Sequence, residues 1–394
     1  RSRATPLAPC NGPAPFSIIQ FGVPQVDVPE SQGLALIPVT RLGDTSTPAT
    51  IKYLVSGISA SERSDFTTAL GTLHFNAGET LKNIEVLITD DATQEANETA
   101  SIALFNVAGA GAGIGPRNQA VLVIHDNDFG TPTSNPSDNA SFFARQHYAD
   151  FLNREPDASG LAFWTNQITE CDQPGATCSA EVRRINVSAS FFLSIEFQQT
   201  GFLVYRLYKA ALPATATRPR ALPRYPEFMS DTQAIGRGVI VGEAGWEQKL
   251  DANTVALVEE FVTRPEFTAN YPATLSPAEY VVRLDAQAGG VLTPTQRDAF
   301  VVGLLTGQET RATVLRKIAE NRVFSGRESN RAFVLMQYFG YLRRNPDDAP
   351  EQGLNFNGYD FWLSKLDAFG GDFQRAEMVK AFITSPEYRG RFMQ

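Results

Sequence analysis

The spacing of apolar residues changes once along this chain, at a stretch rich in Gly, Pro and Ser that begins at residue 130. Before it, short apolar runs are interrupted by Gly, Pro, Asp and Asn, a pattern typical of strands joined by turns. After it, nonpolar and aromatic side chains recur at helical spacing, for example at Phe143, His147 and Phe151. The 394 residues also exceed what one hydrophobic core organises. We therefore predict a multidomain β + α protein.

Seven apolar runs in the first part have the length and the Val, Ile and Leu content of strands. They cover 16–22, 34–41, 50–57, 71–75, 83–90, 99–109 and 119–126. Alternation such as Ile84, Val86 and Ile88 gives a strand one buried face. Seven such strands predict an antiparallel, immunoglobulin-like β-sandwich. The stretch "GAGAGIG" at 109–115 lacks dinucleotide-binding spacing and is interpreted as a hairpin loop.

The second part is predicted to be all-α, with internal repeats. The motif at 148–164 recurs at 338–362 with an insertion, and "FFLSIEF" at 191 recurs as "FVTRPEF" at 261 and "FITSPEY" at 382. The sequences "SPAE" at 276 and "TPTQ" at 293 are typical helix starts. The expected organisation is an extended arm at 1–15, a sandwich at 16–129, a linker at 130–140, a helical unit at 141–210, a Pro-rich segment with middle helices at 211–330, and a second helical unit at 331–394.

The net charge of −9 argues against a nucleic-acid partner, because phosphate contacts depend on clustered Lys and Arg. Almost all of this charge lies between residues 15 and 129, where the balance is −8. No apolar run has the roughly 20 residues that a membrane span requires. The chain starts at Arg1 without Met or an apolar signal segment, so we expect a processed, exported protein.

The three cysteines provide evidence on the cellular compartment of the protein. Cys171 and Cys178 flank a short loop containing Pro and Gly, and we expect a disulfide between them, which suits an oxidising environment. Cys10 is then either free or paired between subunits. The alternative is a cytosolic protein with three reduced thiols.

Carboxylates gather where the predicted strands end, and loops of a sandwich meet at its poles. Calcium requires several oxygen ligands at once, whereas adjacent anions without a cation repel each other. The sequence therefore predicts a calcium site, against the alternative of ordinary solvated surface. The candidate ligands are Glu30, Asp65, Asp90, Asp91, Glu95, Glu98, Asp126 and Asp128.

Residues 16–129 resemble a Calx-beta domain, the calcium-binding module of sodium–calcium exchangers and of adhesin-type surface proteins. The resemblance rests on "SDFTTALGTLHFNAGET", "VLITDDATQEANE" and the terminal "VIHDND". It implies ligands from the acid after the first strand, from the Asp of the "DF" pair, from the "DD…E..E" segment and from the final acidic triplet, which are the eight residues above. Asn127 stands where calcium-sensing members have a third Asp, so we expect fewer ions or weaker binding.

The helical part, at 141–210 and 331–392, resembles the bacterial family called domain of unknown function 4214, which is similar in pattern to phycobilisome linker domains. That resemblance implies an assembly module in an exported protein. From the residues themselves we expect two helix caps, two turn glycines and two core anchors, respectively Asp157 and Asp347, Gly160 and Gly358, and Trp164 and Trp362. Carbohydrate stacking on the two tryptophans is the alternative.

Catalytic motifs are sparse. The three histidines fall inside predicted strands or helices, and neither zinc-protease, serine-hydrolase nor phosphate-loop spacing occurs. We therefore expect a non-enzymatic, secreted or cell-surface structural protein of a bacterium that self-assembles as a homo-oligomer, filament or surface layer. The arm is expected to lie on a neighbouring subunit, with Cys10 buried or cross-linked there. Alternatives are an adhesin that binds polysaccharide and, third, a glycan-acting hydrolase.

Overall fold

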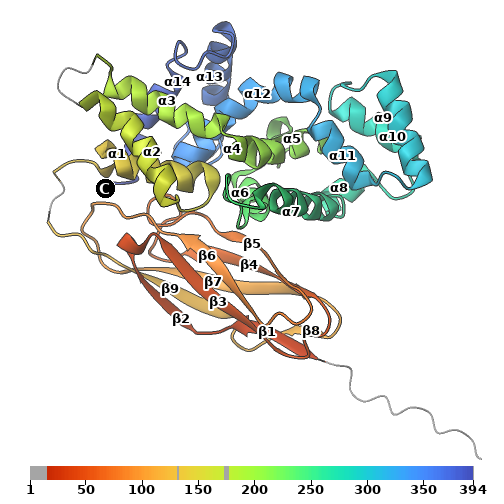
Figure 1. Ribbon diagram of the computed structural model, residues 1–394, viewed down its shortest axis with the longest axis horizontal. Helices are drawn as coiled ribbons and strands as arrows, with labels where there is room; N and C mark the ends of the chain where they lie inside the picture. Colours follow the sequence, from red (N-terminus) through yellow and green to blue (C-terminus); the bar gives the residue numbers. More distant parts are fainter. Residues whose placement is uncertain (1–15, 131–132, 173–176, 394) are drawn as a thin grey trace, which may run out of the picture.

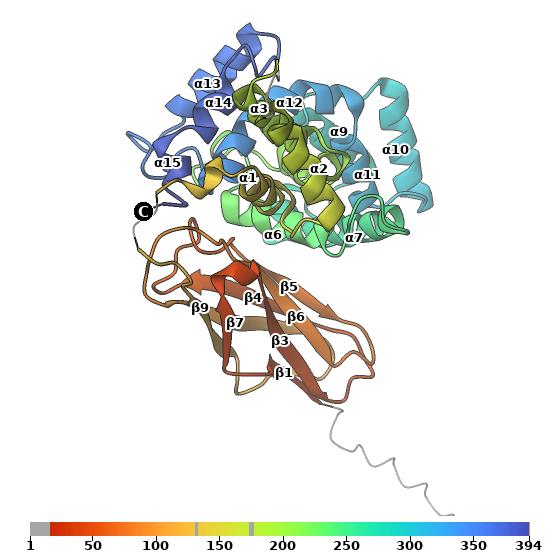
Figure 2. The ribbon, with the colours of Figure 1, turned by 60° about the vertical axis from the view of Figure 1, so that its left-hand side comes forward.

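The computed structural model describes residues 16–130, 133–172 and 177–393 (Figure 1). A β-sandwich is followed by a helical region that sits on one end of the sandwich (Figures 1 and 2). The predicted change from strands to helices after residue 130 is confirmed. The predicted arm and Cys10 lie outside the described residues.

The sandwich contains two sheets that enclose one apolar core. One sheet has the strand order β6-β3-β1-β8 and the other β2-β9-β7-β4-β5. Strand residues alternate between the core and solvent, so Ile84 and Val86 are buried while Glu85 is exposed. The elements are β1 (Ser17–Phe21), β2 (Gln25–Pro29), η1 (Glu30–Gln32), β3 (Leu34–Gly43), β4 (Ala49–Gly57), β5 (Leu70–Phe75), β6 (Leu81–Leu87), β7 (Glu98–Ala108), β8 (Ala112–Ile114) and β9 (Gln119–His125).

The sandwich differs from the expected one in two strands. All seven expected strands form, but β2 and β8 bring the number within the described residues to nine. Both extra strands are short edge strands that pair in parallel, β2 with β9 and β8 with β1, so the sandwich is not purely antiparallel. The predicted hairpin loop at 109–115 is therefore only partly a loop, because its second half pairs with β1. A strand of three residues, such as β8, carries too little periodicity to be recognised locally.

The helical region has one continuous core that runs from Phe143 to Phe392 and includes the middle helices. Its helix starts follow local chemistry, and Ser276 and Thr293 both form the predicted capping boxes. The elements are η2 (Pro136–Asp138), α1 (Ala140–His147), η3 (Tyr148–Leu152), α2 (Ala158–Thr169), η4 (Glu170–Asp172), α3 (Ala180–Leu193), α4 (Ile195–Gln199), α5 (Gly201–Ala211), η5 (Pro219–Ala221), α6 (Tyr225–Gly236), α7 (Trp246–Phe261), α8 (Pro265–Asn270), α9 (Pro277–Gln287), α10 (Pro294–Thr306), α11 (Arg311–Ala319), α12 (Arg322–Met336), η6 (Gln337–Tyr341), α13 (Asn357–Ala368), α14 (Met378–Ile383) and α15 (Pro386–Arg389).

The internal repeats appear in the structure as a recurring three-residue contact. In each copy an Arg guanidinium lies over a Tyr ring, at 4.9, 4.9 and 5.4 Å from its centroid, and pairs with a Glu carboxylate at 2.7, 2.7 and 2.6 Å. The sets are Tyr148, Arg154 and Glu196; Tyr208, Arg218 and Glu266; and Tyr338, Arg344 and Glu387. A third copy thus begins at Tyr208 in α5 and continues into the middle helices, and the sequence revealed only "FVTRPEF" of it.

Some individual roles in the repeat were predicted correctly and others were wrong. Asp157 caps α2 by accepting a hydrogen bond from the Gly160 amide, as expected. Asp347 caps no helix and instead accepts from Arg224, because the insertion that follows it delays the next helix until Asn357. Gly160 and Gly358 lie in the first turns of α2 and α13, against tyrosine hydroxyls, and not in turns between helices.

Trp164 and Trp362 are partly buried against the helical core, as expected of packing residues. Among the described helices, none combines the length and the apolar character required to cross a bilayer.

Candidate metal centre

The predicted acidic residues lie in turn η1, in loops and at strand ends at one end of the sandwich. This end of the sandwich faces the helical region (Figures 1 and 2). Turn η1 supplies Glu30, and the loop between β4 and β5 supplies Asp65. The loop from β6 to β7 contains Asp90, Asp91 and Glu95 and ends at Glu98, the first residue of β7. The segment after β9 supplies Asp126 and Asp128. Strand ends far apart in sequence are adjacent here because the two sheets stack face to face.

Six of the eight carboxylates form two compact groups. In each group, one oxygen per residue lies within 4.8 Å of the others, and the groups are Glu30, Asp91 and Asp128, and Asp65, Glu95 and Glu98. The remaining two, Asp90 and Asp126, lie beside these groups. Asp126 accepts hydrogen bonds from the amides of Glu95 and Asp128 at 3.0 and 2.9 Å. Asp90 accepts from the Asn127 side chain at 3.1 Å, so the Asn that departs from the family pattern is a donor and not a third acid.

Burial and mutual repulsion disfavour ionisation of this cluster. Burial, and then the neighbouring carboxylates, raises the pKa of Glu30 from 4.5 to about 9. Burial, a hydrogen bond with Asp65 and the neighbouring carboxylates raise the pKa of Glu98 to about 8, and burial and the neighbouring carboxylates raise that of Glu95 to about 7. Burial raises the pKa of Asp91 to about 6 and also raises the pKa of Asp128. Without a cation, the cluster therefore retains protons at neutral pH.

Within the described part of the chain, two buried oxygens of the first group have no hydrogen-bond partner, Glu30 Oε1 and Asp128 Oδ2. Glu30 is only 8% exposed. A buried oxygen without a donor is costly, and a hard divalent cation such as calcium would supply the missing partner. The donor set, made only of carboxylate oxygens from several loops, fits calcium chemically.

The cysteines and histidines of the described residues belong to neither carboxylate group. Cys171 and Cys178 form the predicted disulfide, with an S–S distance of 2.01 Å. His147 is buried and hydrogen-bonded to the Phe143 carbonyl and to Ser188, whereas His125 pairs with exposed Asp27. Among the described residues, the two carboxylate groups are the sets of three or more potential metal ligands that lie close together.

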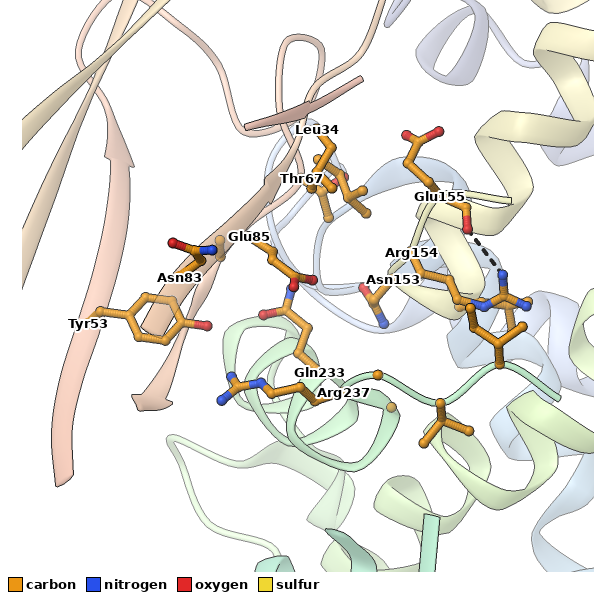
Figure 3. Close-up of a pocket in the computed structure, with 17 residues that line it drawn as sticks. Leu34, Tyr53, Thr67, Asn83, Glu85, Asn153, Arg154, Glu155, Gln233 and Arg237 are labelled. Atoms are coloured by element: carbon orange, nitrogen blue, oxygen red, sulfur yellow. Dashed lines mark hydrogen bonds between the residues drawn. The ribbon is translucent and has the colours of Figure 1, made fainter. Parts of the chain in front are cut away.

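Nothing in the sequence indicates how the acidic end of the sandwich meets the helical region. A cavity of about 230 Å³ lies at this junction, with Tyr53 and Glu85 contributed by the sandwich and Asn153, Gln233 and Arg237 by the helices (Figure 3). Beside it, arginines from the second repeat donate hydrogen bonds to the loop that contains Asp65. In the sequence, nothing distinguishes Arg343 and Arg391 from other charged residues near a helix end.

Comparison with known proteins assigns the first part of the chain. A family model described as the Calx-beta domain matches residues 16–128. Adhesion G-protein coupled receptor V1 of Danio rerio is 31% identical over 113 residues, which are 29% of this chain and 2% of that receptor. The apo form of the Calx CBD1 domain is 30% identical, with 29% of this chain and 99% of that one covered and a TM-score of 0.28. The calcium binding domain CBD12 of CALX1.1 is also 30% identical, with 28% and 46% covered and a TM-score of 0.27.

This chain therefore spans a very small part of the curated relative, and the family model falls on the sandwich. The family model covers the same residues whose strand ends bring the acidic cluster together. Residues 16–128 of this protein form a Calx-beta domain.

Proposed function

We propose that the sandwich binds calcium through the two carboxylate groups. The observation that carries this proposal is the pair of buried, unpartnered oxygens in a cluster whose carboxyls repel one another. One ion would be held by Glu30, Asp91 and Asp128, and a second by Asp65, Glu95 and Glu98. Asp90 and Asp126 would complete or orient these sets, because they already contact the same loops. The match to the Calx-beta domain, a calcium-binding family, supports the choice of ion.

Bound calcium would then rigidify the loops that contain its ligands. Extracellular modules bind calcium with dissociation constants of roughly 0.1–1 mM. At about 1 mM calcium, such affinities would add roughly 0.4–1.4 kcal/mol to the free energy of unfolding.

The test is calorimetric titration of the chelator-treated full chain with calcium. Asp91→Asn disables the first group and Glu98→Gln the second, so each variant should lose one binding event while retaining the other. Glu85→Gln, which removes an exposed carboxylate from β6, is the matched control and should bind as the wild type does. Absence of heat from the wild type up to about 10 mM calcium, an upper limit well beyond extracellular affinities, would refute the proposal.

We further propose that the protein is exported and acts at the cell surface as a non-enzymatic structural protein. The Cys171–Cys178 disulfide supports an oxidising compartment. The similarity of the sandwich to part of an adhesion receptor supports a surface role. The helical region would serve as the assembly module that its resemblance to domain of unknown function 4214 implies.

We also propose, more specifically, that the protein self-associates. Phe163 and Phe361 hold corresponding positions in two repeats, lie edge-to-face against Trp164 and Trp362, and are 54% and 59% exposed. Exposed aromatic side chains are enriched at protein interfaces. Analytical ultracentrifugation over a wide concentration range should reveal oligomers that Phe163→Ser and Phe361→Ser disperse. A wild type that stays monomeric would refute self-association, and binding to a glycan array would favour an adhesin.

A further inference from the structure

The loop from Ser61 to Thr68 contacts both the acidic cluster and the helical region. It contains Asp65, which is 7% exposed and belongs to the second carboxylate group. The Asp65 carboxylate accepts a hydrogen bond from the Ser61 amide at 2.5 Å, and its carbonyl accepts one from the Thr89 amide at 2.9 Å. Thr89 directly precedes Asp90 and Asp91. A displacement of this loop would therefore move ligands of both groups.

On the helical side, a buried charged network faces this loop. Asp150 of η3 has a fully buried side chain that accepts two hydrogen bonds from Arg391, at 3.0 and 2.9 Å. Arg343 donates to the same carboxylate at 3.1 Å. Both arginines are almost fully buried, at 3% and 4% exposure. Because two guanidinium groups share one carboxylate, one positive charge of the network has no anionic partner among the described residues.

Further guanidinium donors of both arginines point to the loop, although Arg391 also donates to the Tyr341 carbonyl of the helical region at 2.9 Å. Arg343 donates to the Phe66 carbonyl and to the Thr67 hydroxyl, each at 2.9 Å. Arg391 donates to the Arg63 carbonyl at 2.8 Å. These contacts fix the backbone on both sides of Asp65. Hydrogen bonds from charged donors are stronger than neutral ones, and burial excludes competing water.

The backbone at Arg343 indicates that its side chain is needed there. Arg343 has a left-handed conformation, with φ of 49°. At the corresponding position of the first repeat stands Asn153, with φ of 55°. Asn tolerates this conformation better than Arg does. The guanidinium contacts with the loop explain why an Arg stands at position 343, where the left-handed backbone conformation is unfavourable for it.

We propose that Arg343 and Arg391 are positioning residues for the metal ligand Asp65, so that cation binding in the sandwich and docking of the helical region stabilise each other. This inference rests on the proposed calcium site. The coupling must be reciprocal, because both events favour the same position of one loop. Calcium should stabilise the helical region, although every proposed ligand lies in the sandwich.

The chain contains its own reporter for this effect. All three tryptophans, Trp164, Trp246 and Trp362, lie in the helical region, so their fluorescence follows unfolding of that region alone. Thermal unfolding of the full chain should be followed by this fluorescence in calcium and in chelator. Calcium binding itself should be measured by calorimetry on the same samples. We expect calcium to raise the midpoint reported by tryptophan.

Two variants weaken the connection while sparing the ligands. Thr67→Val keeps the shape of the side chain but removes the acceptor for Arg343. Arg391→Lys keeps a positive charge for Asp150 but removes the donor to the Arg63 carbonyl. Each should weaken calcium binding about fivefold or more and shrink the calcium-dependent shift of the tryptophan midpoint. Arg237→Ala is the control, because it removes a hydrogen bond between the same two parts, to the Thr72 carbonyl in β5, away from the cluster.

The outcomes separate the two proposals. Binding heat in the wild type without any calcium-dependent shift in the tryptophan midpoint would overturn the coupling and leave the calcium site intact. Wild-type calcium affinity in both variants would overturn it as well. Absence of binding heat in the wild type would overturn the site itself and the coupling with it. A similar loss of affinity in Arg237→Ala would show that general weakening of the junction, and not the positioning of Asp65, is responsible.

Discussion

Replacing Glu30 by Gln should make the metal-free protein more stable at neutral pH and weaken its binding of calcium. Gln has the shape of a protonated Glu but cannot ionise. In the metal-free protein, burial and neighbouring carboxylates oppose the ionised form of Glu30. A neutral residue removes that cost, whereas a calcium ion loses one of its charged ligands. Opposite effects on stability and on binding distinguish this mechanism from general disruption of the fold.

The magnitude follows from the pKa of Glu30, which is raised from 4.5 to about 9. Between these values the folded protein retains a proton that the unfolded chain has released, so stability falls as the pH rises through this window. Each pH unit costs about 1.4 kcal/mol. Between about pH 5 and about pH 7.5, Glu30 alone should lower the free energy of unfolding of the metal-free wild type by about 3 kcal/mol. In Glu30→Gln this decrease should be absent.

Hydrogen exchange measured by mass spectrometry suits this test, because peptides from β7 and β9 report opening of the sandwich without interference from the helices. The comparison is made in chelator, at both pH values, for the wild type, for Glu30→Gln and for the exposed control Glu85→Gln. In calcium, Glu30→Gln should bind about tenfold more weakly, equivalent to about 1.4 kcal/mol. Equal pH dependence in wild type and Glu30→Gln would refute the reasoning.

Three further predictions follow from the same structure. Calcium binding at pH 7 should release about two protons, because Glu30, Glu98 and Glu95, with pKa values of about 9, 8 and 7, hold protons in the metal-free protein. Identical titration heats in buffers of different ionisation enthalpy would contradict this release. Replacing both Cys171 and Cys178 by Ser should lower the stability of the helical region by about 2 kcal/mol in urea unfolding followed by tryptophan fluorescence, and an unchanged midpoint would be the contrary result. Gly160→Ala should destabilise the helical region, because the added Cβ would collide with the Tyr148 hydroxyl. Gly326→Ala, which adds a methyl group in open space on α12, should stabilise the same region by about 0.5–1 kcal/mol. An unfolding midpoint that is higher in Gly160→Ala than in Gly326→Ala would contradict the close packing of Gly160.

Strong local periodicity made most of the fold predictable. The seven expected strands and the capped helices at Ser276 and Thr293 are recognisable from a few consecutive residues. Strand β8 is only three residues long, and β2 and β8 both form through parallel pairing with strands distant in sequence. Such pairing depends on the assembled sheet, so no local pattern identifies it.

The acidic cluster was predictable because its members share one kind of position. All eight carboxylates follow or precede strands whose ends meet at the same pole. Their separation into two groups was not predictable, since it depends on the exact approach of loops such as that containing Asp65. Their contact with the helical region was also hidden. Asp150 occupies the place where the second repeat has Gly340, and nothing in either motif shows that this acid is buried between two arginines.

Calcium binding by the two carboxylate groups is tested most directly by a crystal structure of the full chain grown in calcium, with anomalous diffraction recorded at long wavelength. We expect one anomalous peak among Glu30, Asp91 and Asp128 and another among Asp65, Glu95 and Glu98, with carboxylate oxygens about 2.3–2.6 Å from each ion. The absence of a peak at either group at about 10 mM calcium, well above the affinities of extracellular modules, would contradict calcium binding there.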